Sequence, residues 1–396
     1  MIQLTRNAVD VLPEGRLAEQ LAGGRPLRVK LGIDPTTADI HLGHTVVLGK
    51  LAEFQRDGHT VVLIIGDFTA RVGDPSGRSS ARPLPSAEEI EANAATYQEQ
   101  AFKLLDRDRT EVRFNSEWLL PLGSPGMIKL AAKYTLARML ERDDFKKRWA
   151  EGRPIALHEL LYPLAQGYDS VALKADVELG SSDQLFNLLV GRTLQKEYGQ
   201  EPQVCLTGPL LEGTDAREEN GKIVGDKMSK SLGNYVGIDE PAGDQYGKLM
   251  SISDGLMWRY YELLSRRTAA QNADLRRGHP KAAKMALARE IVERHHGPEA
   301  ARAAEDAFEQ VHARREAPDE IEERELPRDP GAALLPLLKA LPKLGLASSG
   351  SEARRLIAQG GVTVEGARVS DPNAALPPGL HLIKVGKRKF VRLHVR

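Results

Sequence analysis

The N-terminal half of the chain alternates apolar, strand-like runs with amphipathic helical stretches. Residues 28–34 (RVKLGID) predict a short strand, and a helix is expected from about His44 to Asp57, closed by Gly58. Residues 60–67 (TVVLIIGD) form a continuous apolar run, which is typical of a strand buried on both faces. Strand, helix and strand at this spacing indicate a βαβ unit, and hence parallel strands.

Further apolar runs continue this alternation. Residues 85–106 predict a helix, and residues 111–114 (EVRF) predict the next strand. Residues 174–180 (KADVELG) predict a strand that leads into a helix from about Asp183, and residues 203–207 (QVCLT) predict another strand. We therefore expect an α/β fold with a doubly wound, parallel, Rossmann-like sheet.

The chain has 396 residues, which is enough for two to four domains. Residues from about 115 to 173 interrupt the alternation with helical sequence, and helices rich in Ala, Arg and Glu follow residue 240. Acidic residues 316–331, with three prolines, are interpreted as a linker. We predict a Rossmann-like domain at 1–225, with a helical insertion at about 115–173, followed by a loop and linker at 226–240. An α-helical domain is predicted at 241–325 and a small α+β domain at 334–396.

The formal net charge is zero, but the charges are unevenly distributed. Residues 331–396 contain eleven basic and three acidic residues, a net charge of +8, so residues 1–330 carry −8. A small basic module on an acidic body favours a nucleic-acid contact. A solubilising tail is the alternative, but the helical and strand-like patterns within this segment argue against disorder.

Cellular location is indicated by what the composition lacks. No run of about 18 apolar residues occurs, so no membrane span is expected. The N-terminus has no apolar core of signal-peptide length, and Cys205 is the single cysteine. A cytoplasmic, reducing compartment is therefore expected.

Two histidines stand where the helix after the first strand begins. The segment 34–44 reads DPTTADIHLGH, which places His41 and His44 three residues apart. A helix N-terminus attracts phosphate, imidazole N–H groups can bind phosphate oxygens, and Gly43 leaves room for a flat base. A metal site or an ordinary strand–helix turn are the alternatives, although no third metal ligand lies nearby in the sequence.

A second motif at residues 227–231 reads KMSKS, with Gly225 before it and Gly233 after it. Its two lysines, Lys227 and Lys230, could close on a polyphosphate and neutralise a pyrophosphate leaving group. Alone, such a loop is more often a solvated turn. Together with HLGH after the first strand, it resembles the paired signature of class I aminoacyl-tRNA synthetases.

A third motif, YPLAQGYD at residues 162–169, combines polar and apolar positions. In a helix, Tyr162, Gln166 and Asp169 share one face, and their apolar neighbours turn that face inward. A buried amide and carboxylate need partners, so the set predicts a polar ligand. An internal hydrogen-bond network is the alternative.

With this stretch, the chain resembles the bacterial tyrosyl-tRNA synthetases, in the branch that carries an intact KMSKS. The resemblance covers essentially the whole chain and includes a C-terminal segment similar to an S4 RNA-binding domain. The matching segments are Gly32 to His44, GDFTARVGDPSG at 66–77, YPLAQGYD at 162–169, GSSDQ at 180–184 and KMSKS at 227–231.

The resemblance implies roles for individual residues in the catalytic domain. Asp169 is expected to accept a hydrogen bond from the substrate phenol and so to reject phenylalanine. Other residues are expected to hold the tyrosine ammonium (Asp74, Tyr162, Gln166), its carboxylate (Gln184), the adenosine (Gly43, Asp183, Ser229) and the phosphates of ATP (Thr36, His41, His44, Lys227, Lys230, with Arg78 and Arg82 as helpers). Magnesium is expected to accompany ATP without a dedicated protein metal site.

Two positions depart from the family pattern. Many members have a tyrosine on the first strand that reaches the phenol hydroxyl, whereas Lys30 stands there in this chain. A glutamine before GSSDQ is replaced by Glu178. Lys30 could donate to the phenol, or Asp67 could take over that contact, and specificity rests mainly on Asp169.

The resemblance also implies partners and a reaction. Tyrosine and ATP form tyrosyl-adenylate and pyrophosphate, and the tyrosyl group then passes to the terminal ribose of tRNA(Tyr). The helical domain is expected near the anticodon, the insertion at a homodimer interface, and four basic residues at the RNA: Arg354, Arg355, Lys387 and Arg388. The alternatives are a tryptophanyl enzyme, a small-molecule nucleotidyltransferase and a non-catalytic RNA-binding protein derived from a synthetase.

Overall fold

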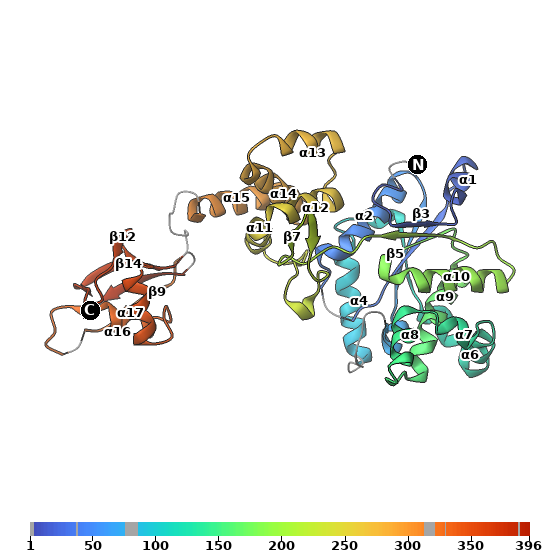
Figure 1. Ribbon diagram of the computed structural model, residues 1–396, viewed down its shortest axis with the longest axis horizontal. Helices are drawn as coiled ribbons and strands as arrows, with labels where there is room; N and C mark the ends of the chain where they lie inside the picture. Colours follow the sequence, from blue (N-terminus) through green and yellow to red (C-terminus); the bar gives the residue numbers. More distant parts are fainter. Residues whose placement is uncertain (1–3, 37–38, 76–85, 313–320, 329, 387–388) are drawn as a thin grey trace. The chain divides into compact units, whose positions relative to one another are not determined.

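The computed structural model describes residues 4–36, 39–75, 86–312, 321–328, 330–386 and 389–396. The chain forms two compact units, Met1–Glu305 and Asp306–Arg396, which are coloured from blue to orange and from orange to red in Figure 1. Each unit has its own sheet.

The first unit is built on a six-stranded sheet with the order β1-β6-β5-β2-β3-β4. Strands β2 to β6 run parallel, and β1 pairs with β6 in the antiparallel direction. All the strands predicted from the apolar runs are confirmed, whereas the short edge strand β1 was not predicted. The strands are β1 (Asp10–Leu12), β2 (Arg28–Ile33), β3 (Thr60–Ile65), β4 (Thr110–Phe114), β5 (Val177–Ser181) and β6 (Val204–Gly208).

Helices cover both faces of this sheet. From β2 the chain proceeds outward through α2 (Leu42–Arg56), β3 and α4 (Ala87–Ala101) to β4, while β5 proceeds through α10 (Leu185–Glu197) to β6 in the other direction. Because such crossovers are right-handed, the two sets of helices lie on opposite faces. The order reverses between β2 and β5, and ligands of doubly wound sheets bind at the carboxyl ends of the strands beside such a reversal.

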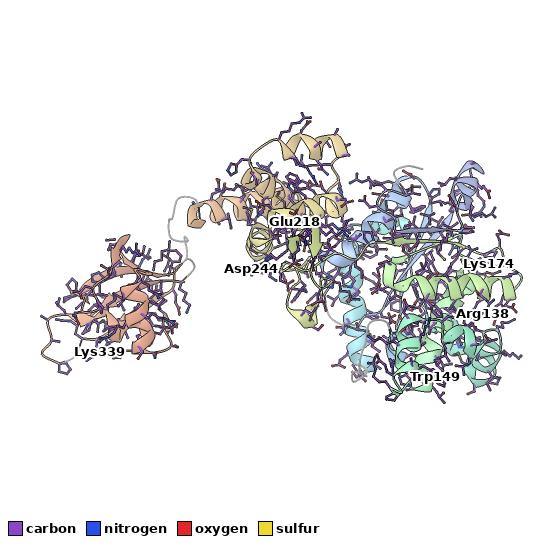
Figure 2. All side chains as sticks on the ribbon, in the orientation of Figure 1. Arg138, Trp149, Lys174, Glu218, Asp244 and Lys339 are labelled. Carbon is purple, nitrogen blue, oxygen red and sulfur yellow. The ribbon has the colours of Figure 1, made fainter. Side chains whose placement is uncertain are left out.

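The helical insertion lies between β4 and β5. Its core contains Leu130, Met139 and Phe145, which pack with Val190 and Leu194 of α10. Figure 2 labels Arg138 and Trp149 on this insertion. Its helices are α5 (Ser116–Leu119), α6 (Gly123–Ala131), α7 (Leu136–Met139), α8 (Asp143–Ala150) and α9 (Tyr162–Leu173).

A helical region follows β6 and a short hairpin of β7 (Arg217–Glu219) and β8 (Lys222–Val224). Its core contains Tyr246, Tyr260 and Tyr261, each almost fully buried. Its helices are α11 (Ala242–Ser251), α12 (Asp254–Leu264), α13 (Ala269–Arg276), α14 (Pro280–His296) and α15 (Pro298–His312), the last of which continues beyond Glu305. The remaining helices of the first unit are α1 (Arg16–Ala22) and α3 (Thr69–Val72).

The second unit is a small α+β domain. Helices α16 (Leu337–Lys343) and α17 (Gly350–Ala358) share a core with a five-stranded sheet, and Leu337, Ile357 and Ile383 are fully buried there. The sheet has the order β12-β11-β14-β15-β9, with β9 (Glu323–Leu326), β11 (Val362–Val364), β12 (Ala367–Val369), β14 (Gly379–Val385) and β15 (Lys389–Val395); β10 (Leu335–Pro336) pairs with β13 (Ala375–Leu376).

Strand β9 lies inside the acidic segment that the sequence suggested to be a linker, and for these four residues that interpretation was wrong. It pairs in parallel with β15, and Arg392 of β15 lies 2.9 Å from the Glu323 carboxylate. The acidic residues of the segment thus face basic residues of the adjacent strand. Among the described helices, none is both long and apolar enough to cross a membrane.

Candidate active site

A cavity of about 400 Å³ opens at the carboxyl ends of β2 and β5, beside the reversal of strand order. The histidine pair and the lysine loop line this same cavity, together with the polar face of α9. The site residues proposed from the sequence that line it are Thr36, His41, Gly43, His44, Asp74, Tyr162, Gln166, Asp169, Asp183, Gln184, Lys227, Ser229 and Lys230. Arg78 and Arg82 lie outside the described residues, as do Lys387 and Arg388 of the second unit.

The histidine pair caps the start of α2. The His41 Nδ1 atom accepts from the Gly43 backbone N–H at 3.1 Å, and the His44 Nδ1 atom accepts from the His41 backbone N–H at 3.2 Å. A neutral imidazole that accepts at Nδ1 carries its proton at Nε2. Each ring is therefore left with an Nε2–H donor.

Both imidazoles are held in the neutral form. Burial, together with the smaller effect of the Lys227 and Lys230 charges, lowers the pKa of His41 to about 2 and that of His44 to about 4. The two rings can therefore donate hydrogen bonds to an anion across the physiological pH range without becoming charged themselves.

Gly43 is required by this cap. A Cβ atom at this position would lie 2.9 Å from the His41 ring and 3.7 Å from the Met228 Cβ atom. The first contact is closer than real Cβ atoms approach one another, so any side chain here would displace the imidazole.

Both lysines of the KMSKS loop are held by carboxylates. Lys227 Nζ lies 2.7 Å from Asp183, and Lys230 Nζ lies 2.7 Å from Asp39. The loop is anchored at its backbone, where the Met228 N–H donates to the Leu211 carbonyl at 2.7 Å. The ammonium groups are thus placed at the cavity wall by ion pairs that are partly exposed to solvent.

Asp169 lies at the base of the cavity and is 3% exposed. Trp118 Nε1 donates to one carboxylate oxygen at 2.8 Å, and Asn115 Nδ2 lies 3.5 Å from the other. Burial raises the pKa of Asp169 to about 7, although the Lys30 charge and the Trp118 hydrogen bond oppose this rise. The carboxyl group is therefore poised between its two protonation states near neutral pH.

Tyr162 is connected to Asp169 through a chain of hydrogen bonds. The Tyr162 hydroxyl donates to Asp34 at 2.9 Å, and the Thr69 hydroxyl donates to the other Asp34 oxygen at 2.7 Å. Asn115 in turn donates to Thr69 at 3.0 Å. Burial raises the pKa of Tyr162 well above its usual value, so its hydroxyl remains a donor.

Asp74 and Gln184 also line the cavity and contact each other. Gln184 Nε2 donates to Asp74 at 2.9 Å, and the buried Arg142 guanidinium lies 3.3 Å from the same carboxylate. Asn187 Nδ2 donates to the Gln184 amide oxygen at 3.2 Å, which fixes that amide in turn.

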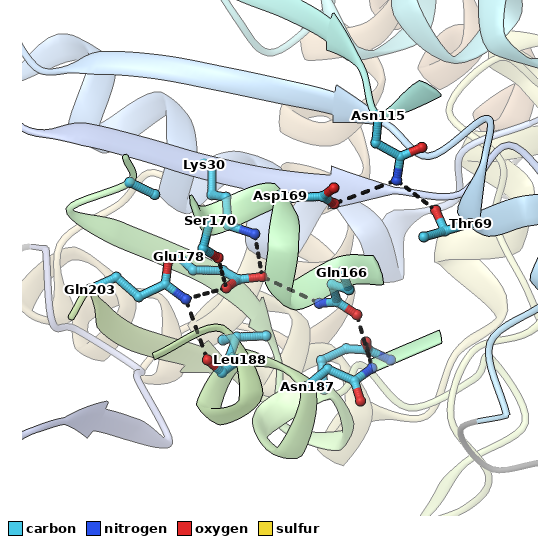
Figure 3. A network of polar contacts seen from close by, with 12 residues as sticks. Lys30, Thr69, Asn115, Gln166, Asp169, Ser170, Glu178, Asn187, Leu188 and Gln203 are labelled. Carbon is cyan, nitrogen blue, oxygen red and sulfur yellow. Dashed lines mark hydrogen bonds and ion pairs between the residues drawn. The ribbon is translucent and has the colours of Figure 1, made fainter. Parts of the chain in front are cut away.

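Lys30 and Asp67 do not meet the cavity. Lys30 Nζ forms an ion pair with Glu178 at 2.8 Å, with both side chains buried, as Figure 3 shows. The Asp67 carboxylate accepts from the Ser116 backbone N–H at 3.0 Å. Neither residue is among the described residues that line the cavity, so the two contacts to the phenol considered from the sequence are not supported.

The sequence reasoning missed several residues of the site. Asp34, Thr69 and Asn115 line the cavity, and Trp118 and Arg142 contact lining residues. Two of the five carry a signal that could have been used: Asp34 and Asn115 each directly follow a parallel strand, at the sheet edge where ligands bind.

Known proteins that resemble this chain are class I tRNA synthetases with an S4 domain. Residues 22–313 match the family model for class I tRNA synthetases (W and Y), and residues 335–382 match that for the S4 domain. Tyrosine–tRNA ligases of Nitratidesulfovibrio vulgaris and Thiobacillus denitrificans are 52% and 54% identical, each over 99% of this chain and 98% of the relative.

The chain belongs to the tyrosine–tRNA ligase family.

Another tyrosine–tRNA ligase, from Bordetella pertussis, is 55% identical over 98% of this chain and 94% of its own. Solved structures of more distant family members share the fold. The Archaeoglobus fulgidus tyrosyl-tRNA synthetase complexed with L-tyrosine has a TM-score of 0.60 at 23% identity, covering 77% of this chain and 98% of its own. The truncated mitochondrial enzyme of Aspergillus nidulans has a TM-score of 0.64 at 22% identity, covering 78% and 92%.

Proposed function

We propose that the chain, as a tyrosine–tRNA ligase, activates tyrosine with ATP and then transfers the tyrosyl group to tRNA(Tyr). One observation carries the assignment of residues: the histidine pair, the lysine loop and Asp169 line a single cavity. ATP and tyrosine bound side by side in this cavity could therefore reach the phosphate-binding groups and the phenol acceptor. The tyrosine–tRNA ligases described above match nearly the whole chain, and they give no support to a tryptophanyl, nucleotidyltransferase or non-catalytic function.

In the first step, the tyrosine carboxylate attacks the α-phosphate and pyrophosphate leaves. The carboxylate is already ionised, so the protein contributes positioning and charge stabilisation. The Nε2–H groups of His41 and His44 donate to phosphate oxygens, assisted by Thr36. Lys227 and Lys230 exchange their carboxylate partners for the β- and γ-phosphates as negative charge develops there.

Adenosine is assigned to the part of the cavity beside β5. Asp183 holds the ribose once Lys227 has left it, while Gly43 and Ser229 contact the nucleotide. Mg²⁺ is assigned to ATP itself, because this ion keeps several waters and commonly binds through substrate phosphates.

Tyrosine is assigned to the part of the cavity beside α9. Asp169 accepts the phenol hydrogen bond, which a phenylalanine side chain cannot offer. Asp74, Tyr162 and Gln166 hold the ammonium group, and Gln184 lies beside the carboxylate.

For the second step, the S4-like unit offers a surface for tRNA. Arg354 and Arg355 lie on α17 and are exposed, and Arg355 reaches no closer than 3.8 Å to Glu352. Such side chains contact phosphates and give affinity that falls with salt concentration. Because charged tRNA is consumed in translation, we assign the enzyme to the cytoplasm as part of this proposal.

The test of this function is ATP–pyrophosphate exchange with each amino acid, followed by charging of tRNA. Exchange is expected with tyrosine, and charging is expected with tRNA(Tyr). Exchange with tryptophan would show that the enzyme is a tryptophanyl-tRNA synthetase instead. The absence of any exchange would favour a non-catalytic RNA-binding role.

We also propose that the enzyme is a homodimer joined through the helical insertion. This part of the first unit exposes five large apolar side chains, between 56% and 81% accessible: Leu120, Ile128, Leu136, Trp149 and Leu157. So many exposed large apolar side chains in one part of the chain favour a protein-binding surface.

Ile128→Asp is expected to shift the enzyme toward monomer, because a buried, unpaired carboxylate at an interface is costly. The measurement is sedimentation equilibrium over a range of protein concentrations. Leu380→Asp changes another exposed apolar residue, in the S4-like unit (58% exposed, against 70% for Ile128), and is expected to leave the assembly unchanged. A monomeric wild-type enzyme, or a dimer unaffected by Ile128→Asp, would contradict the proposal.

A further inference from the structure

A buried ion pair lies behind the amino-acid pocket, outside the set of residues that line it. Lys30 of β2 and Glu178 of β5 are register partners on adjacent parallel strands. Their side chains are 1% and 2% exposed, and the Lys30 Nζ atom lies 2.8 Å from Glu178. Burying two charges is costly unless they are paired and further hydrogen-bonded, so the surroundings of this pair matter.

Glu178 is surrounded by donors. Besides Lys30, its carboxylate accepts from Ser170 at 3.1 Å, from Gln166 at 3.3 Å and from Gln203 (Figure 3). Two of these donors, Gln166 and Ser170, lie on α9, the helix that presents the polar face of the pocket. The ion pair is thereby tied to the residues assigned to tyrosine.

The first consequence concerns the Gln166 amide. Its Nε2 group donates to Glu178, and its oxygen accepts from Asn187 at 2.9 Å. A flipped amide would turn its oxygen toward the Glu178 carboxylate and its NH₂ group toward Asn187 Nδ2, and both contacts would be lost. Glu178 therefore fixes which way round the Gln166 amide lies, with its oxygen toward Asn187, and this oxygen is the acceptor that Gln166 offers to the ammonium group assigned to it.

The second consequence concerns Asp169, which precedes Ser170 on α9. The Lys30 charge lowers the pKa of Asp169, and the Glu178 charge raises it by a smaller amount. The titratable groups on the surrounding elements are Lys30 on β2, Glu178 on β5, Cys205 on β6, Tyr162 on α9 and Asp34 after β2. Arg192 on α10 acts on Cys205, whereas Lys30 is the cation among the groups that shift the pKa of Asp169.

We propose that the Lys30–Glu178 ion pair is a positioning element of the tyrosine pocket. Glu178 orients the Gln166 amide for the substrate ammonium, and Lys30 supplies the positive charge that keeps the Asp169 carboxylate available to the phenol. The pair acts from behind the pocket instead of touching the substrate, because neither residue is among the described residues that line the cavity. This inference rests on the proposed role of Asp169.

The experiment is the pH dependence of kcat/KM for tyrosine in ATP–pyrophosphate exchange, between about pH 5.5 and 9. In the wild-type enzyme, kcat/KM is expected to rise as pH rises through about 7, because the ionised Asp169 carboxylate accepts the phenol hydrogen bond more strongly than the protonated carboxyl group does. Lys30→Met removes the cation and is expected to move this acid limb upward by roughly one pH unit. At neutral pH the KM for tyrosine should increase, whereas kcat and the KM for ATP should change little.

The double variant Lys30→Met/Glu178→Gln removes both charges. Because Lys30 has the larger influence on Asp169, its acid limb should lie between those of the wild type and Lys30→Met. If the pair had only a structural role, both variants would change in kcat and thermal stability. The acid limb of the double variant would then not lie between those of the wild type and Lys30→Met. The double variant leaves no unpaired buried charge, so it carries the test if Lys30→Met does not fold.

Lys284→Met is the control for the loss of a lysine far from the pocket, since Lys284 is largely buried and forms an ion pair with the exposed Asp254 at 2.7 Å in the helical region. Its pH profile should equal that of the wild type. Folded variants at Lys30 whose acid limbs coincide with the wild-type limb would overturn the proposal. A wild-type enzyme without an acid limb near pH 7, together with an Asp169→Ala variant that still rejects phenylalanine, would instead contradict the role of Asp169 itself.

Discussion

Lys230→Ala is expected to slow tyrosyl-adenylate formation by roughly 10²- to 10³-fold in kcat, the usual loss for a group that stabilises charge in the transition state. The negative charge on the pyrophosphate grows as it leaves, and the Lys230 ammonium is one of the two that the KMSKS loop places to stabilise it. Tyrosine binding should remain nearly intact, because the Lys230 ammonium is held at Asp39 and none of its contacts involves a residue assigned to tyrosine. Stopped-flow or quench-flow measurement of adenylate formation, with a separate tyrosine titration, distinguishes the two effects.

Lys222→Ala provides the control for this variant. Lys222 lies on the exposed β7–β8 hairpin, and its loss removes the same charge from the same unit. Its rate of adenylate formation should equal that of the wild type. If Lys230→Ala formed the adenylate at the wild-type rate, Lys230 would have no role in the chemical step.

Asp169→Ala is expected to reduce discrimination between tyrosine and phenylalanine by on the order of 10²-fold or more. Rejection of phenylalanine by tyrosyl-tRNA synthetases is itself the standard example of this effect: without the substrate hydroxyl, a buried polar group loses its partner. Removing the carboxylate takes away the penalty for phenylalanine and the attraction for tyrosine together. The ratio of kcat/KM values for the two amino acids in pyrophosphate exchange measures the change.

Asp176→Asn provides the comparison for Asp169. Asp176 is a half-buried carboxylate just before β5, at the amino end of the same sheet, where it binds Arg25 at 2.5 Å. Its replacement changes a comparable charge away from the cavity, so discrimination should stay at the wild-type level even if stability falls. Full rejection of phenylalanine by Asp169→Ala would show that another group recognises the phenol.

The elements that build the sheet were predictable because their residues are buried on both faces. Val61 to Ile65 of β3 are almost fully buried, and such a run of apolar residues has few alternatives to a central strand. The histidine pair and the lysine loop were also accessible to prediction, because each motif is contiguous and has one plausible chemistry when the two occur together.

The strands that were missed owe their structure to partners distant in sequence. Strand β1 has three residues and pairs with β6 nearly 200 positions away, and β7 and β8 are polar and exposed. Strand β9 (EREL) lacks an apolar run and takes its conformation from β15. In such cases tertiary pairing overrides local propensity.

The interior of the site shows the same limit. Spacing on α9 placed Tyr162, Gln166 and Asp169 on one face, but it could not show that Tyr162 would bind Asp34 or that Trp118 would bind Asp169. Lys30 was recognised as an unusual residue, and only the pairing of β2 with β5 shows that Glu178 is its counterpart. Two departures from the family pattern are therefore one structural feature.

The acidic strand β9 has a consequence for dissecting the enzyme. A fragment that begins at residue 334, where the sequence alone would place the start of the S4-like domain, lacks the outermost strand of its sheet. Such a fragment would leave the β15 backbone open to pairing with other chains, and Arg392 would lose its Glu323 partner. An autonomous RNA-binding fragment should therefore begin upstream of Glu322, and it would carry less positive charge than the basic tail alone.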